Sequence, residues 1–314
     1  MVRTGMGHDA PSQSVMCQSM PILPPEPFPW PFDGDVWRMA MGLRAQEMGS
    51  WLMPDAGWPE QMAERARLIR NRKWDVMALM PEARAASAEV MGLLFAHLTA
   101  QFPDWFCRVG RGVESRVDGA RLDPADFEHP LHLLAHLLPD DLCLMTPSPG
   151  GWRLTGGVVC FPSHWMLPHK LGKPLPGIHR PVARYDAMLA TPVDRFFDTL
   201  SPGRVVWRAN WTLSDDPTLF QPGTKAHVPP DADIDEGNAG ERLWLRVERQ
   251  TLTKLPDSGA VLFTIRTHQR PLYALTGAER RQFALVLRSV PDDVAAYKGL
   301  RRTGPLAVGY CEKA

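Results

Sequence analysis

The sequence predicts an α+β fold, in which helices pack on an antiparallel sheet of about five strands and a helical region precedes the sheet. Two observations lead to this prediction. Residues 59–138 are dominated by helical patterns, whereas residues 141–267 contain short runs rich in β-forming residues and bounded by Gly, Pro, Ser or Asp. Few helical stretches separate these runs, so parallel crossovers are scarce and an antiparallel sheet is favoured.

The first part of the chain leads from a flexible arm into helices. Residues 1–27 are polar and then rich in proline, which predicts a mobile lead-in to one domain over residues 28–300. Residues 59–101 are expected to form two helices, each opening with a proline at a plausible first turn. The second helix carries an apolar stripe at helical spacing, made of Val90, Leu93, Leu94 and Leu98. A short helix follows at 130–138.

The rest of the chain alternates strands with loops and ends in helix. Strands are predicted at 141–146, 151–161, 204–213, 242–252 and 259–267. A proline-rich loop at 161–182 and a helix at 183–200 separate the second strand from the third. The polar stretch 214–241 indicates a surface insertion. Helix returns at 276–300, and residues 301–314 are expected to be a tail.

Composition excludes several classes of function. The chain has 314 residues, and its 35 basic residues balance 35 acidic ones, so no net field attracts nucleic acid or an anionic membrane. A signal-peptide pattern is absent, as is any apolar run of the roughly 18–20 residues that span a bilayer. The five cysteines are widely spaced, without a Cys-x-x-Cys pair, which argues against disulfides, zinc knuckles and iron–sulfur sites. A cytoplasmic protein is expected.

Histidines are the first candidates for chemistry. The loop 161–182, FPSHWMLPHKLGKPLPGIHRPV, holds three of them and is too rich in proline for a core helix. Prolines restrict the backbone on both sides of His179, so this residue would lose little entropy on binding a metal or haem iron. A turn histidine that caps backbone groups is the commoner alternative. His132 and His136 have the spacing of a metal-chelating pair, but leucines surround them and no acidic ligand lies alongside.

Alternation along the predicted strands places polar side chains in rows. Arg208 and Asn210 share a face of the third strand, and Glu248 lies in a polar row of the fourth. Arg266 ends a row on the fifth strand. Such rows usually form the solvent-exposed face of a sheet. If helices or the insertion cover that face, the four residues become a buried polar cluster of the kind that marks a site.

Several sequence blocks resemble a known family. The blocks IHRPV, VWRANWTL and LRVERQTLTKLPDSGAVLFTIRT are similar to the haem-dependent oxidative N-demethylase family, and the resemblance runs from about Pro31 to Tyr297. It implies a PAS-like five-stranded fold, b-type haem, and use of O₂ to demethylate a secondary amine such as dimethylamine, with release of formaldehyde and a primary amine. The chain departs from the family pattern at Trp58, where a tyrosine is expected, and over 214–240.

The resemblance also suggests roles for individual residues. The family pattern retains His179, which is therefore the expected iron ligand, whereas His164 and His169 fall at variable positions. The side chains expected around the haem are Lys170, Arg208 and Arg266 as partners of the propionates, and Trp165 and Trp211 as walls of the pocket or as core.

The charge of the expected substrate indicates which residue would bind it. A protonated amine favours a carboxylate, and Glu248 is the expected anchor, with Asn210 near it. The alternative is that Glu248 is ion-paired with Arg246 or Arg208 as structural support.

The expected partners are separate flavin or iron–sulfur reductase subunits, because the sequence has no nucleotide fingerprint and no clustered cysteines to carry electrons. Two other functions stay open. One is a haem PAS-type sensor of O₂ or redox state without turnover, and the other is a scaffold subunit without haem. No kinase, cyclase or DNA-binding output segment is seen, which favours the enzyme.

Overall fold

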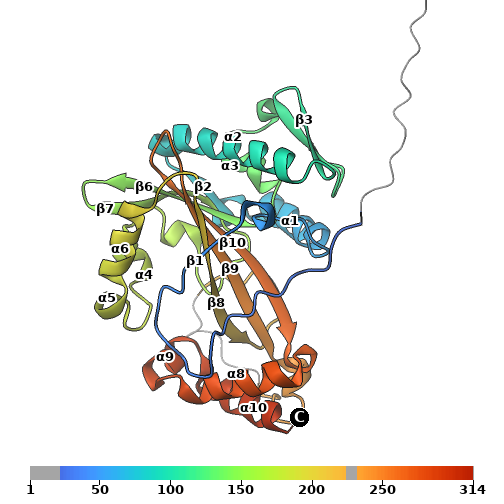
Figure 1. The fold of residues 1–314 in the computed structure, drawn as a ribbon, viewed down its shortest axis with the longest axis vertical. Coiled ribbons are helices and arrows are strands. Elements are labelled where there is room, and N and C mark those ends of the chain that lie inside the picture. Colours follow the sequence, from blue (N-terminus) through green and yellow to red (C-terminus); the bar gives the residue numbers. More distant parts are fainter. Residues whose placement is uncertain (1–21, 224–231, 314) are drawn as a thin grey trace, which may run out of the picture.

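A seven-stranded antiparallel sheet forms the centre of the molecule, with helices packed around it and a three-stranded sheet at one end (Figure 1). The computed structural model describes residues 22–223 and 232–313. The predicted α+β class is confirmed. Most of the predicted lead-in lies outside the described residues, and its described part, 22–27, has no regular secondary structure.

The five long strands are the five that the sequence predicts. They are β6 (Asp141–Ser148), β7 (Gly151–Val158), β8 (Val205–Ser214), β9 (Trp244–Lys254) and β10 (Val261–Pro271). They lie in the order β8-β9-β10-β6-β7, and two short edge strands complete the sheet, β1 (Arg44–Ala45) beside β8 and β2 (Met77–Leu79) beside β7. The sheet therefore has seven strands rather than five, because two- and three-residue strands are too short to show an alternating pattern.

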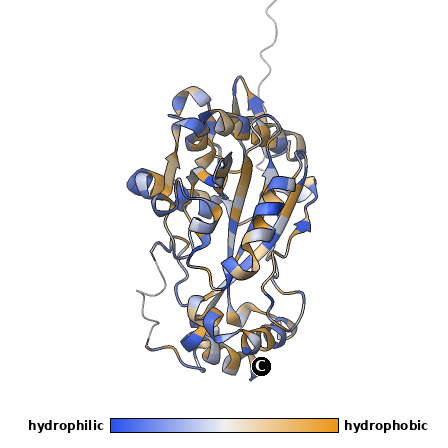
Figure 2. Ribbon diagram, turned by 90° about the vertical axis from the view of Figure 1, so that its left-hand side faces the viewer, coloured by the Kyte–Doolittle hydropathy of each residue, from blue (hydrophilic) through white to orange (hydrophobic). Residues whose placement is uncertain are grey.

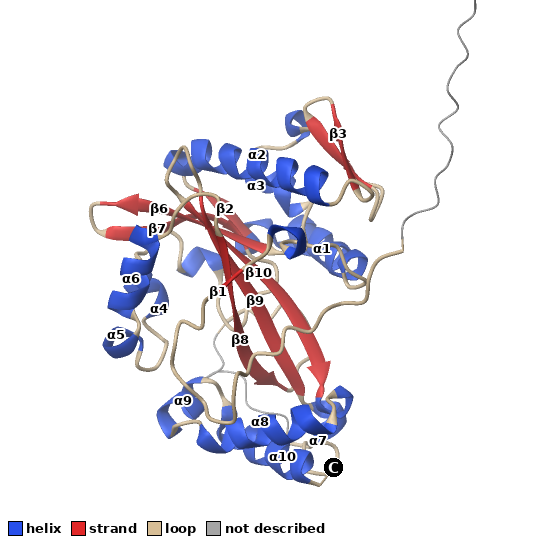
Figure 3. Cartoon of the chain, in the orientation of Figure 1, coloured by secondary structure: helices blue, strands red, loops and turns tan. Residues whose placement is uncertain are grey.

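The helices gather in three groups around this sheet (Figure 3). The first group is α1 (Trp58–Val76), α2 (Arg84–Gln101) and α3 (Pro130–Ala135), next to the small sheet of β3 (Phe106–Val109), β4 (Gly112–Ser115) and β5 (Arg121–Leu122). The second group is α4 (Leu175–His179), α5 (Tyr185–Met188) and α6 (Ala190–Thr199). The third is α7 (Ala239–Arg242), α8 (Gly277–Ser289), α9 (Asp292–Tyr297) and α10 (Leu300–Glu312). Short 3₁₀ helices lie at Met48–Ser50, Pro81–Ala83, Pro124–Asp126, Leu167–His169 and Leu272–Ala274.

Helix α10 corrects the expectation of a tail after residue 300. The run Gly304-Pro305 has the composition of a turn, yet Pro305 lies inside the helix. Apolar residues on α10, including Ala307 and Cys311, are fully buried in the cluster that also contains Phe283 of α8. Burial of this apolar face outweighs the weak local preference for helix.

The two faces of the central sheet have separate hydrophobic cores. Figure 2 shows hydrophobic residues running along the central strands. One face packs against α1, α2 and the C-terminal helices. The other packs against the segment 161–200, where Leu167, Leu175 and Phe197 contact the cluster that includes Leu252. Both faces of the sheet are therefore covered. The polar rows predicted on the strands are thus shielded from solvent and can form a buried polar cluster. Among the described residues, no helix is both long enough and apolar enough to cross a membrane.

A fully buried ion pair links α1 to the start of β6. Arg65 Nη1 donates to Asp141 Oδ1 at 2.7 Å, and neither side chain is exposed. The Asp141 carboxylate also accepts the backbone N–H groups of Cys160 and Phe161, at 2.7 and 2.9 Å. This pair thereby fixes the turn from which the segment 161–200 departs.

Removal of the Arg65 charge is expected to destabilise the fold strongly. Arg65→Met leaves the buried Asp141 carboxylate without its cation, which costs about 3–5 kcal/mol of unfolding free energy. Denaturant unfolding followed by circular dichroism measures this loss. The control Arg67→Met breaks an exposed pair with Glu64 that solvent screens, and it should leave the free energy of unfolding nearly unchanged. Equal losses in both variants would contradict the prediction.

Candidate functional site

Strand pairing brings three of the predicted site residues onto one face of the central sheet, which we call the site face. In the β8–β9 pair, Asn210 lies opposite Glu248 and Arg208 lies opposite Gln250. Residues directly opposite one another in an antiparallel pair project to the same side. This side is the one covered by the segment 161–200. The site face therefore holds a polar cluster beneath the proline-rich loop.

The Glu248 carboxylate is held by neutral groups. Its side chain is 7% exposed, and its Oε2 accepts from Gln250 Nε2 at 2.7 Å and from Asn210 Nδ2 at 3.3 Å. Glu248 makes no ion pair within the described ranges 22–223 and 232–313. A buried carboxylate with only amide donors keeps the capacity to attract a cation.

Arg246 does not pair with Glu248, which was the alternative role considered for it from the sequence. Its Nε donates to Ser163 Oγ at 2.9 Å, and its Nη2 donates to the carbonyl oxygens of Phe161 and Leu219 at 2.8 and 3.0 Å. The guanidinium thus ties the start of the proline-rich loop to the stretch after β8. Arg246 is a positioning residue for that loop and is not the hydrogen-bond partner of Glu248.

Two further cations, Arg208 and Lys170, lie on the site face, and neither forms an ion pair with another described residue. Burial lowers the pKa of Arg208, although Glu248 opposes that shift, and Arg208 Nε is buried without a hydrogen-bond partner in the described structure. Burial also lowers the pKa of Lys170, whose Nζ lies 4.6 Å from the centre of the Trp165 ring. Partly buried cations without an ion-pair partner favour an anionic ligand. The carboxylates of a haem fit this requirement.

His179 ends the one-turn helix α4, which forms within the loop because Pro176 occupies the first turn. Its Nδ1 lies 2.9 Å from the carbonyl oxygen of Leu175. A carbonyl only accepts, so Nδ1 carries the proton and Nε2 holds a free lone pair, as in metal-binding histidines. Burial, the largest cause, lowers the pKa of His179 to about 4, with Lys170 and Arg208 adding to the shift. The imidazole is therefore neutral at pH 7 and suited to bind iron.

Tyr185 is a site residue that the sequence did not reveal. Its ring stacks on the imidazole of His179 with centroids 4.4 Å apart and planes 14° from parallel. It is 3% exposed, and its hydroxyl is buried without a partner in the described part of the chain. The turn between α4 and α5 brings Tyr185 back over His179. Such a turn has no periodicity that a sequence pattern could signal.

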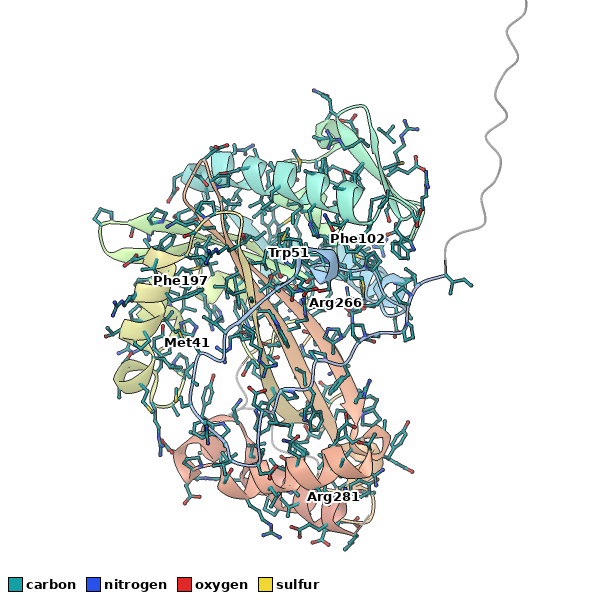
Figure 4. The ribbon with its side chains drawn as sticks, viewed as in Figure 1. Met41, Trp51, Phe102, Phe197, Arg266 and Arg281 are labelled. Atoms are coloured by element: carbon teal, nitrogen blue, oxygen red, sulfur yellow. The ribbon has the colours of Figure 1, made fainter. Side chains whose placement is uncertain are left out.

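Arg266 does not join the cluster, which corrects the expectation for this residue. In the β9–β10 pair Glu248 lies opposite Thr267, so Arg266 projects to the other face. There its Nη2 donates to Asp55 Oδ1 at 2.8 Å, and Asp140 lies 3.9 Å from Nη1. Figure 4 shows Arg266 near Trp51 and away from Phe197, which packs on the site face. Its charge is neutralised within the fold, so it is not available for a propionate.

Trp211 and Trp165, the two tryptophans expected around the haem, lie on opposite faces of the sheet. Trp211 lies opposite Val247, on the face away from Glu248, and packs against Phe32 and Phe283 with centroids 5.2 and 5.7 Å apart. It therefore fills core. Trp165 packs against the hydrophobic cluster of the site face, with Lys170 Nζ over its ring, and stays a candidate wall of the haem pocket.

His169, His132 and His136 lie outside this cluster. His169 is exposed on the 3₁₀ helix Leu167–His169. The rings of His132 and His136 lie 5.5 Å apart near α3. No group of three or more His, Cys, Asp or Glu side chains suited to a metal ion is found in the described residues.

Together, a neutral histidine with a free Nε2, two partly buried cations and a carboxylate held by amides fit a site for haem. The family comparison agrees. Residues 42–308 match the family model described as haem-dependent oxidative N-demethylase, alpha subunit-like. The match covers most of the chain and confirms the resemblance inferred from the sequence. The chain belongs to this family, whose name indicates a haem-dependent oxidoreductase and a subunit of a larger assembly.

Proposed function

We propose that the chain binds one b-type haem through His179 and uses O₂ to demethylate a small secondary amine such as dimethylamine. The observation that supports this best is the presence of three kinds of group on the site face: the free Nε2 of His179, the partly buried cations Lys170 and Arg208, and the amide-held Glu248. The contiguous block of five long antiparallel strands also supports a PAS-like core for this haem site.

Each residue has a role in this proposal. Haem iron, when bound, supplies the activation of O₂. The bond from His179 Nδ1 to Leu175 orients the imidazole, and Tyr185 holds its plane by stacking. Arg208 and Lys170 pair with the propionates. Glu248 attracts the protonated amine, because opposite charges interact more strongly away from bulk water.

Asn210 and Gln250 act on the amine through Glu248. Each donates a side-chain N–H to Glu248 Oε2, which holds the carboxylate in one orientation. Their neutral amides leave the negative charge available to the substrate. The site thereby positions the N-methyl groups of the amine while the charge on its nitrogen is neutralised.

The reaction needs electrons from outside the chain. Dimethylamine, O₂, two electrons and two protons give methylamine, formaldehyde and water. The sequence has no nucleotide fingerprint and no clustered cysteines. We therefore propose separate flavin or iron–sulfur reductase subunits as partners.

The haem-loaded chain alone is expected to form no formaldehyde from dimethylamine, O₂ and NADPH, because its sequence has no nucleotide-binding fingerprint. Replacing NADPH by a chemical one-electron donor should start formaldehyde release, measured colorimetrically. A sample without amine controls for formaldehyde from other sources. Sustained turnover with NADPH alone would contradict the need for a reductase, and no formaldehyde with either donor would contradict the proposed demethylation.

A further inference from the structure

Thr267 of β10 lies on the site face, directly opposite Glu248 of β9. The β9–β10 register pairs these two residues, and the side chains of such a pair project to the same side of a sheet. The preceding residue agrees with this direction, because Arg266 projects to the other face and pairs there with Asp55 at 2.8 Å. Side chains alternate along a strand, so Thr267 faces the site.

The Thr267 hydroxyl is buried without a partner. The residue has no exposed surface, and its Oγ1 makes no hydrogen bond with any residue of the described ranges 22–223 and 232–313. Buried hydroxyls in folded proteins are usually hydrogen-bonded, because an unpaired one gives up its bonds to water without replacement. An unpaired hydroxyl opposite the proposed substrate anchor therefore favours a ligand that supplies the missing bond.

The start of the proline-rich loop covers this end of the site face. Arg246 lies two residues before Glu248, so their side chains share one face of β9. The Arg246 guanidinium donates to the carbonyl oxygen of Phe161 at 2.8 Å and to Ser163 Oγ at 2.9 Å. Glu248 itself is only 7% exposed. A ligand between Glu248 and Thr267 would thus exchange its bonds to water for bonds to these two side chains.

Glu248 and Thr267 together offer two acceptors to one ligand. Asn210 and Gln250 both donate to Glu248 Oε2, and no side chain in the described part of the chain donates to Oε1. The hydroxyl oxygen of a threonine also has lone pairs that accept. The Cβ atoms of directly opposite residues lie about 4.5–5.5 Å apart, so a single ligand nitrogen can reach both side chains.

We propose that Thr267 determines selectivity for secondary over tertiary amines, by accepting one N–H of a dialkylammonium ion whose other N–H is held by Glu248. This inference rests on the proposed function and assigns its choice of substrate class to a residue of β10. A secondary ammonium ion has two N–H groups, whereas a tertiary one has a single N–H. A tertiary amine therefore leaves the buried hydroxyl unpaired, at a cost in binding.

The test compares two amines on the haem-loaded protein by isothermal titration calorimetry, which gives Kd values for dimethylamine and trimethylamine. Thr267→Val keeps the shape of the side chain and removes the hydroxyl. The Kd for dimethylamine should rise roughly tenfold, as for a lost hydrogen bond to a charged group, while the Kd for trimethylamine stays unchanged. Thr267→Ser keeps the hydroxyl and should retain the preference for dimethylamine.

Thr264→Val is the matched control. Thr264 is a buried threonine of the same strand, but it faces the other side of the sheet, where its Oγ1 lies 2.7 Å from Thr251 Oγ1. This control should lower the denaturant midpoint of unfolding and leave the ratio of the two Kd values unchanged. Thr267→Val should not lower the midpoint, because it removes no hydrogen bond within the protein.

The outcomes separate this inference from the function on which it rests. Loss of the dimethylamine preference in Thr267→Val, with its retention in Thr267→Ser, supports the inference. Unchanged Kd values in Thr267→Val, or equal weakening of both amines, would overturn it and leave the proposed function in place. If the haem-loaded wild-type protein binds neither amine, the proposed function fails first and the inference falls with it.

Discussion

Replacement of His179 by alanine is expected to abolish or strongly alter the Soret band of the haem-loaded protein while the chain stays folded. The neutral imidazole, with its proton on Nδ1 and its free lone pair on Nε2, is the expected iron ligand on the site face. The fold does not depend on it, because His179 lies on a one-turn helix and the main cores are formed elsewhere. Absorbance spectra and far-UV circular dichroism measure the two parts of this expectation.

Two controls sharpen the test of the iron ligand. His169→Ala removes an exposed histidine of the same loop and should leave the spectrum unchanged. Added imidazole should restore part of the Soret band in His179→Ala, since it can enter the space vacated by the side chain. A wild-type spectrum in His179→Ala would exclude His179 and direct attention to His164 and His169.

Glu248→Gln is expected to keep the haem spectrum and to lose most of the amine response. The change preserves shape and an acceptor oxygen for Asn210 and Gln250 but removes the buried charge. Loss of one partner of a buried charge pair costs about 2–5 kcal/mol of binding, which corresponds to roughly 30-fold or more in the Kd of the amine. Spectral titration with dimethylamine and formaldehyde release measure the loss.

The control for Glu248 is Glu241→Gln, which removes an exposed carboxylate on α7 and should leave amine binding unchanged. Unchanged amine affinity in Glu248→Gln, with normal haem content, would show that the substrate anchor lies elsewhere. Loss of the haem spectrum itself would instead show that Glu248 supports the haem site as a structural residue.

Local pattern was enough to predict the main elements and the family. Each of the five long strands has eight or more residues, so alternation and β-propensity showed them clearly, whereas β1 and β2 have two and three residues. The family resemblance was also visible in the sequence blocks, and it selected His179 among three histidines of one loop. Helix α10 was missed because its Gly-Pro pair has the composition of a turn and its stability comes from burial.

The sequence by itself determined which residues alternate along each strand, and thus that Glu248 and Gln250 share a side. Only the tertiary structure decided how the strands align with one another. The β9–β10 register places Thr267 opposite Glu248 and so turns Arg266 to the opposite face, where Asp55 neutralises it. A shift of one residue would have reversed this assignment, because side chains alternate with a period of two. The approach of Tyr185 to His179 likewise depends on the turn between α4 and α5, which no periodic pattern encodes.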